Sequence, residues 1–211
     1  MKHLNPKITT LTLTIVLLAV CLASAAQAAT TTVKAAASAS EPKIGDTLTV
    51  TISITDVTNL YGVDVELNWN PNVLSLIEAK SKLGVESNPG GILHESGTDT
   101  LLVVEDSASQ TTGTYILIAS STGASPAFSG SGTIATLTFN VTSAGSSGLT
   151  LQSELADKPA TGQTANFIQH TDTADNITTI VPEFSSIAII AILVIAATAA
   201  LVIIKKRTIK P

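Results

Sequence analysis

Alternation of apolar and polar side chains is the feature that most restricts how this 211-residue chain can fold. Residues 48–54 place leucine, valine and isoleucine on one side and threonine or serine on the other. Residues 63–69 and 135–141 repeat the pattern. Side chains alternate across a strand with period two, whereas an amphipathic helix repeats its apolar residues about every 3.6 positions. The pattern therefore predicts half-buried β-strands.

Shorter apolar runs, separated by turns rich in Gly, Pro and Asn, predict the remaining strands. The Gly/Ser-rich stretch 120–132 predicts a flexible loop, and the polar stretch 156–176 predicts a long one. About nine short strands with regularly spaced turns indicate an all-β fold, an antiparallel β-sandwich or jelly roll. The additional strands are expected at 31–37, 73–80, 92–93, 101–105, 115–119, 149–151 and 177–180.

The first 28 residues have the features of a secretory signal peptide, which we expect to form a signal helix. Lys2 and Lys7 lie in a basic head, and residues 11–23 are apolar apart from threonines. Residues 26–28, Ala-Gln-Ala, match the small-x-small pattern that signal peptidase accepts, so we expect cleavage after Ala28. The alternative is an uncleaved N-terminal helix, for which the apolar stretch is short.

An uncharged apolar segment at 187–204 predicts one transmembrane helix. At about 1.5 Å per residue it would span roughly 27 Å, close to the hydrocarbon thickness of a bilayer. The basic tail at 205–211 follows, and basic residues stay on the cytoplasmic side. We therefore expect a single-pass protein of the cell membrane, with residues 29–181 outside and the tail in the cytoplasm.

Residues 182–186 form a linker that begins with Pro182, Glu183 and Phe184. This tripeptide, followed by an apolar segment and a basic cluster, resembles the PEF-type C-terminal sorting signals of archaeal surface proteins. The resemblance implies that a membrane sortase recognises the tripeptide and processes the tail. A plain transmembrane anchor is the alternative.

The expected exterior part is acidic and free of cysteine. Residues 29–181 contain five lysines, no arginine and fifteen acidic residues, a net charge of about −10. This charge argues against nucleic acid and suits a basic partner protein or a neutral glycan, or a solvated surface without a partner. The single cysteine lies in the signal, so disulfides and thiolate metal sites are excluded. Asn140 and Asn176 each begin a glycosylation sequon.

Sequence motifs of catalysis are absent, so we expect a protein that is not an enzyme. His94 and His170 are far apart, and no zinc-protease, serine-hydrolase or phosphate-loop motif occurs. Asp64 and Glu66 form the nearest acid pair on one strand face, but an outer strand face is ordinarily solvated. The calcium-loop pattern of alternating aspartates is also missing, and we expect neither a metal nor a cofactor. Trp69 falls on the apolar face of its strand and is expected in the core.

Three segments resemble cohesin domains in their order and spacing. They are 41–50 (EPKIGDTLTV), 61–74 (YGVDVELNWNPNVL) and 129–139 (SGSGTIATLTF), and a closing region at 155–157 and 175–177 is similar. The resemblance covers about residues 31–181. It implies a non-catalytic jelly roll that binds dockerins, small calcium-stabilised helical modules carried by enzymes, through one face of a sheet.

Alternation places Asp64, Glu66 and Asn68 on the side of their strand that faces away from the core. The resemblance implies that Asp64 matches a dockerin-contacting acid, so these three residues are the predicted partner-binding site. The predicted function is a cell-surface binding module of cohesin type that captures a partner protein, such as a dockerin-bearing enzyme, in polysaccharide breakdown. The alternatives are direct carbohydrate binding and a structural surface protein or adhesin.

Overall fold

The computed structural model describes residues 30–95 and 100–180. The predicted signal peptide, linker with its Pro-Glu-Phe motif, transmembrane helix and basic tail all lie outside these ranges. Within them, no helix is long and apolar enough to cross a membrane. The described residues form only strands and irregular segments, which confirms the all-β fold class. The strands are β1 (Thr32–Ala37), β2 (Thr47–Asn68), β3 (Leu74–Ser81), β4 (Leu102–Ser109), β5 (Thr114–Ser120), β6 (Phe128–Val141), β7 (Gly145–Gly148), β8 (Thr150–Asp157), β9 (Thr171–Ala174) and β10 (Asn176–Thr179).

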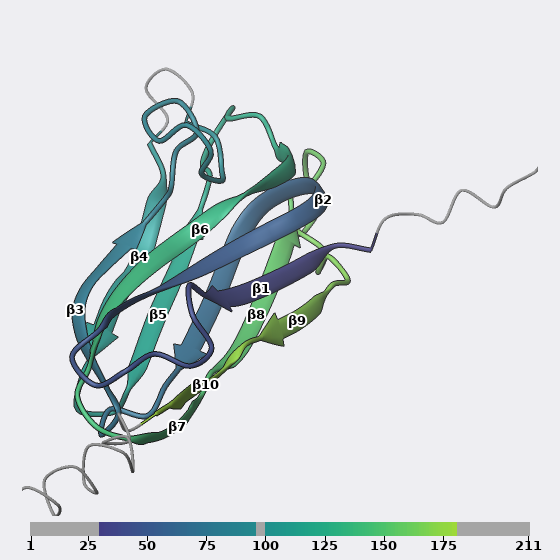
Figure 1. Cartoon of the computed structure of the whole chain (residues 1–211). Coiled ribbons are helices and arrows are strands. Elements are labelled where there is room, and N and C mark those ends of the chain that lie inside the picture. Colours follow the sequence, from purple (N-terminus) through teal and green to yellow (C-terminus); the bar gives the residue numbers. More distant parts are fainter. Residues whose placement is uncertain (1–29, 96–99, 181–211) are drawn as a thin grey trace, which may run out of the picture. The chain divides into compact units, whose positions relative to one another are not determined.

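The strands form a sandwich whose two layers share β2 (Figure 1). One layer has the order β3-β6-β2-β1-β9, and the other has the order β4-β5-β2-β8. β7 and β10 pair with each other as a small separate ribbon. Nearly all pairings are antiparallel, but β9 runs parallel to β1. The sandwich is therefore confirmed, with one parallel pair at the edge of the first layer.

β2 is a single strand where the sequence predicts two. Its first part pairs with β1 and β6, and its last part pairs with β5 and β8. Between them the register with β6 shifts twice, and Asp56 and Asn59 adopt positive φ angles of 55° and 62°. Asp and Asn tolerate this left-handed region better than other residues with side chains. Figure 1 shows how the strand bends there and passes from one layer to the other.

The structure differs from the predicted strands in four other places. β6 begins at Phe128, inside the stretch predicted as a flexible loop. β7 was not predicted, and β9 lies in the stretch predicted as a long loop. The short strand predicted at 92–93 is only an isolated bridge between Leu83 and Ile92.

The core lies between the two layers and is built from the inward-facing positions of alternating strands. Trp69 follows β2 directly and is only 4% exposed, which confirms its predicted place in the core. Its ring meets that of Phe139 edge to face, with centroids 5.0 Å apart. The inward-facing side chains of β2, β5 and β6 include Leu48, Val50, Ile52, Val63, Val65, Leu67, Tyr115, Leu117, Leu137 and Phe139.

Candidate partner-binding face

Asp64, Glu66 and Asn68 point away from the core, as alternation predicts. Each is half-buried, whereas Val63 and Val65 between them are buried. They form the central row of the outer face of the β4-β5-β2-β8 layer. We call this outer face the acidic face, and define it by Asp64, Glu66 and Asn68 of β2, Ile116 and Ile118 of β5, Gln152 and Glu154 of β8, and Glu105 of β4.

Strand register brings acidic residues from three strands close to Asp64. Glu154 of β8 is its direct partner on one side, and Ile118 of β5 is its partner on the other. Glu105 of β4 lies opposite Ile118 in turn. Partly buried surroundings raise the pKa of Asp64, and the charges of Glu154, Glu66 and Glu105 raise it further. The carboxylates of this face thus repel one another, and a cationic partner would relieve that repulsion.

Asn68 is the least available member of the predicted row. Its amide nitrogen donates to Glu66 Oε1 at 2.8 Å, and its amide oxygen accepts a hydrogen bond from Thr114 Oγ1 at 2.9 Å. Both ends of the amide are therefore occupied within the sheet. Asp64 has the stronger claim to partner contact, because no hydrogen bond or ion pair within the described residues holds its carboxylate.

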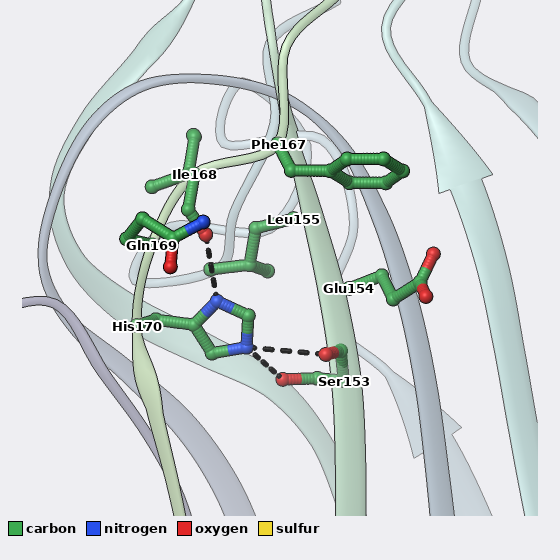
Figure 2. A pocket seen from close by; sticks show the side chains of 7 residues that line it. All are labelled: Ser153, Glu154, Leu155, Phe167, Ile168, Gln169 and His170. Carbon is green, nitrogen blue, oxygen red and sulfur yellow. Dashed lines mark hydrogen bonds between the residues drawn. The ribbon is translucent and has the colours of Figure 1, made fainter.

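Three hollows adjoin on this side of the molecule and share Glu154. A polar hollow of about 310 Å³ lies along β2 and β8, between Glu66 and Asp172. A hollow of about 250 Å³ lies between β8 and the segment before β9 (Figure 2). What we call the apolar hollow has about 240 Å³ and is lined by Gly62, Val63, Asp64, Ile118, Ala119, Ser120, Glu154, Leu155, Ala156 and Phe167.

Phe167 is a large apolar side chain that sequence reasoning did not single out. It is 71% exposed and lines both the apolar hollow and the hollow of Figure 2. Figure 2 shows its ring and the Glu154 carboxylate projecting to the same side of β8. An isolated bridge between Ala156 and Phe167 fixes the backbone at this point. Three further exposed apolar residues, Leu102, Val103 and Val104, lie on the edge strand β4.

Ser153, His170 and Asp172 meet below this surface, but they do not form a nucleophilic triad. Ser153 Oγ donates to Asp172 Oδ1 at 2.6 Å and lies 2.9 Å from His170 Nε2. His170 Nδ1 faces the carbonyl oxygen of Ile168 at 2.8 Å, where a triad would place the carboxylate. The serine proton therefore goes to the carboxylate, and the cluster ties β8 to β9. The described residues contain no group of three side chains that could hold a metal ion.

The two sequon asparagines lie in different surroundings. Asn140 is half-buried within β6, whose backbone pairs with Thr47 on one side and Ser75 on the other. Asn176 is exposed at the start of β10. Both side chains are on outward positions of their strands, and Asn176 is the more open of the two.

Comparison with known proteins decides the family. The model of the cohesin domain family matches residues 31–181. The chain belongs to the cohesin domain family. Cohesin domains are non-catalytic modules that bind other proteins, and the described fold and acidic outer face suit that class. Among curated proteins, none matches the chain.

Solved cohesins share the fold at low sequence identity. The second type II cohesin module of the ScaA scaffoldin of Acetivibrio cellulolyticus is 18% identical, with a TM-score of 0.52 over 72% of this chain and 97% of that chain. A type II cohesin domain from the cellulosome of the same organism is 16% identical, with a TM-score of 0.51 over 70% and 95%. A chain of its type II cohesin–X–dockerin complex is 15% identical, with a TM-score of 0.51 over 71% and 99%.

Proposed function

We propose that this cohesin is a cell-surface module that captures a dockerin-bearing or similar protein through the acidic face. The observation that carries the proposal is the cluster around Asp64, where carboxylates from three strands surround the apolar side chains of Ile116 and Ile118. An apolar centre among like charges is suited to a partner helix with basic and small polar residues. The complex of a related type II cohesin with an X–dockerin supports this choice of partner class.

Titration calorimetry against a panel of isolated dockerin modules tests the proposal. We expect Asp64→Ala to weaken the binding of a recognised dockerin by about 1–3 kcal/mol, because a central contact is lost from the interface. The double variant Glu66→Ala with Asn68→Ala should have a smaller effect, since Asn68 is already bonded within the sheet.

Glu78→Ala is the matched control, because Glu78 is an exposed acid on β3 in the other layer. It should bind like the parent protein, and none of the variants should unfold at a much lower temperature than the parent. If a dockerin binds with the same affinity after Asp64, Glu66 and Asn68 are replaced by alanine, this face is not the site. Failure of every dockerin and of secreted proteins to bind would favour a structural surface role.

Direct glycan binding is the second candidate, and the observation that favours it is Phe167. An exposed aromatic ring beside Glu154 and Gln169 could stack on a sugar and offer hydrogen-bond partners to its hydroxyls. Affinity electrophoresis through gels containing soluble polysaccharides separates the candidates. Retardation that disappears in Phe167→Ala and persists in Asp64→Ala would support glycan binding in polysaccharide breakdown.

The cell-surface location rests on the sequence of the two ends. A signal peptide at 1–28, a transmembrane helix at 187–204 and a basic tail at 205–211 would hold the cohesin outside the cell membrane. Processing at Pro182-Glu183-Phe184 by a sortase would replace the helix with another attachment. The mass of the mature protein, measured after extraction from membranes, distinguishes the retained anchor from the processed one.

A further inference from the structure

The apolar hollow has a floor of small side chains. Strand register places Ser120, Gly62 and Ala156 side by side on β5, β2 and β8. The next row is Ile118, Asp64 and Glu154, and its longer side chains form one wall. Phe167 beside Ala156 forms another. A step from small to large residues across three strands thus leaves a depression of about 240 Å³.

The rim of this hollow carries negative charge that nothing in the described chain neutralises. Asp64 and Glu154 are direct cross-strand partners, and like charges in that position repel each other. Neither forms an ion pair with a described lysine or histidine. None of the residues that line the hollow is basic. A cation supplied from outside would therefore remove an unfavourable interaction as well as form a favourable one.

We propose that the apolar hollow is a pocket for an arginine side chain presented by the partner protein. The proposal rests on the proposed function and specifies its partner. The aliphatic stem of an arginine would lie on Gly62 and Ala156 against the Phe167 ring, and its guanidinium would lie between Asp64 and Glu154. Arginine suits this site because its planar, weakly hydrated cation stacks on aromatic rings and bonds carboxylates through two donors.

Nuclear magnetic resonance of the isotope-labelled full chain tests the pocket without a partner protein. The probe is N-acetyl-arginine methylamide, and its citrulline analogue has nearly the same shape without the charge. We expect saturable shifts of the Gly62, Ser120 and Ala156 amides with arginine, at the weak affinity expected of so small a ligand. Equal binding of citrulline, shifts confined to other regions, or no saturable shift would overturn the proposal. So would binding of a neutral oligosaccharide in place of arginine.

Three variants test the charge and the floor. Asp64→Asn and Glu154→Gln should each weaken arginine binding about two- to fivefold, as expected for partly exposed ion pairs. Gly62→Val should abolish binding by filling the hollow. Its Cβ would lie 3.5 Å from Ala156 Cβ and 3.7 Å from Ala119 O, which are ordinary van der Waals distances. The unfolding temperature of the variant checks that its fold is kept.

Glu41→Gln is the control, because Glu41 is an exposed acid in the connection between β1 and β2. It should bind arginine like the parent chain, and a loss of binding there would indicate nonspecific charge attraction. If arginine fails to bind while dockerin affinity still depends on Asp64, the pocket is refuted and the proposed function stands. If arginine binds and no protein partner does, the pocket stands and the proposed function fails.

Discussion

Asp64 is an unfavourable residue for the free protein at neutral pH. Burial and the neighbouring carboxylates raise its pKa, so the folded chain binds a proton there more readily than the unfolded chain does. The folded state is therefore penalised at pH values above this raised pKa, where Asp64 is charged. The penalty fades as the pH falls toward the pKa of an unfolded aspartate.

We expect Asp64→Asn to raise the unfolding temperature at neutral pH and to have little effect in acid, where the parent carboxyl is already protonated. Calorimetric unfolding across a pH series measures this. The same protonation should weaken the binding of a cationic partner as the pH falls. A variant that is less stable than the parent at neutral pH would contradict this account of the face.

Trp69 stabilises the sandwich through its ring and not through its indole nitrogen. The ring packs against Phe139, whereas Nε1 is buried without a hydrogen-bond partner among the described residues. Trp69→Ala should cost about 3–5 kcal/mol of unfolding free energy, because it opens a large cavity. Trp69→Phe should cost much less, since it keeps an aromatic ring and removes an unpaired buried donor. Denaturant unfolding measures both, and equal losses would show that the nitrogen matters.

At the scale of elements, β2 depends on a left-handed bend that serines of β6 support. The backbone nitrogens of Asp56 and Asn59 donate to Ser131 Oγ and Ser129 Oγ, both at 3.0 Å. These bonds replace ladder bonds that the register shifts remove. The sequence of β2 fits this geometry, because Asp56 and Asn59 occupy the two left-handed positions and apolar and polar residues alternate on either side.

Asp56→Val should destabilise the fold by about 1–2 kcal/mol, because a branched side chain is strained at positive φ. Asp56→Gly is the matched control and should introduce almost no backbone strain, because glycine adopts positive φ readily. Thermal unfolding of the two variants separates backbone strain from the loss of the exposed carboxylate. Equal effects of the two substitutions would show that the bend does not require a left-handed residue.

The sequence predicts those elements whose pattern is local. Apolar and polar residues alternate in 48–54 and in 135–141, and these segments form parts of β2 and β6. β7 consists of Gly and Ser, and β9 is stabilised by its pairing with β1, so neither has an apolar pattern to find. The two halves of β2 look separate because Asp56 and Asn59 resemble a turn.

Only part of the binding face can likewise be predicted from local sequence patterns. Asp64, Glu66 and Asn68 follow from alternation within one strand. Glu154 and Phe167 join Asp64 only through strand pairing and an isolated bridge, which a single sequence does not specify. The predicted residues thus lie in the middle of a surface whose remaining residues are brought together by the fold.

For the whole molecule, the testable expectation is its orientation across the membrane. With a cytoplasmic basic tail, the cohesin would be exposed outside the cell. We expect protease added to intact cells to remove or degrade the cohesin, as followed by an antibody against it. A cytoplasmic protein serves as the control for cell integrity. A cohesin that resists until the membrane is broken, yet is cut readily afterwards, would refute this orientation.

The parallel pairing of β9 with β1 also has a mechanical consequence. Thr32 to Ala35 match Thr171 to Ala174 in register, so the start of β1 and the end of β9 lie at opposite ends of the pair. A pull between the start of β1 and the end of β9 acts along these strands and loads their hydrogen bonds together, in shear. An antiparallel pair pulled at adjacent ends would open one bond after another. The pair of β1 and β9 is thus suited to carry tension along its length.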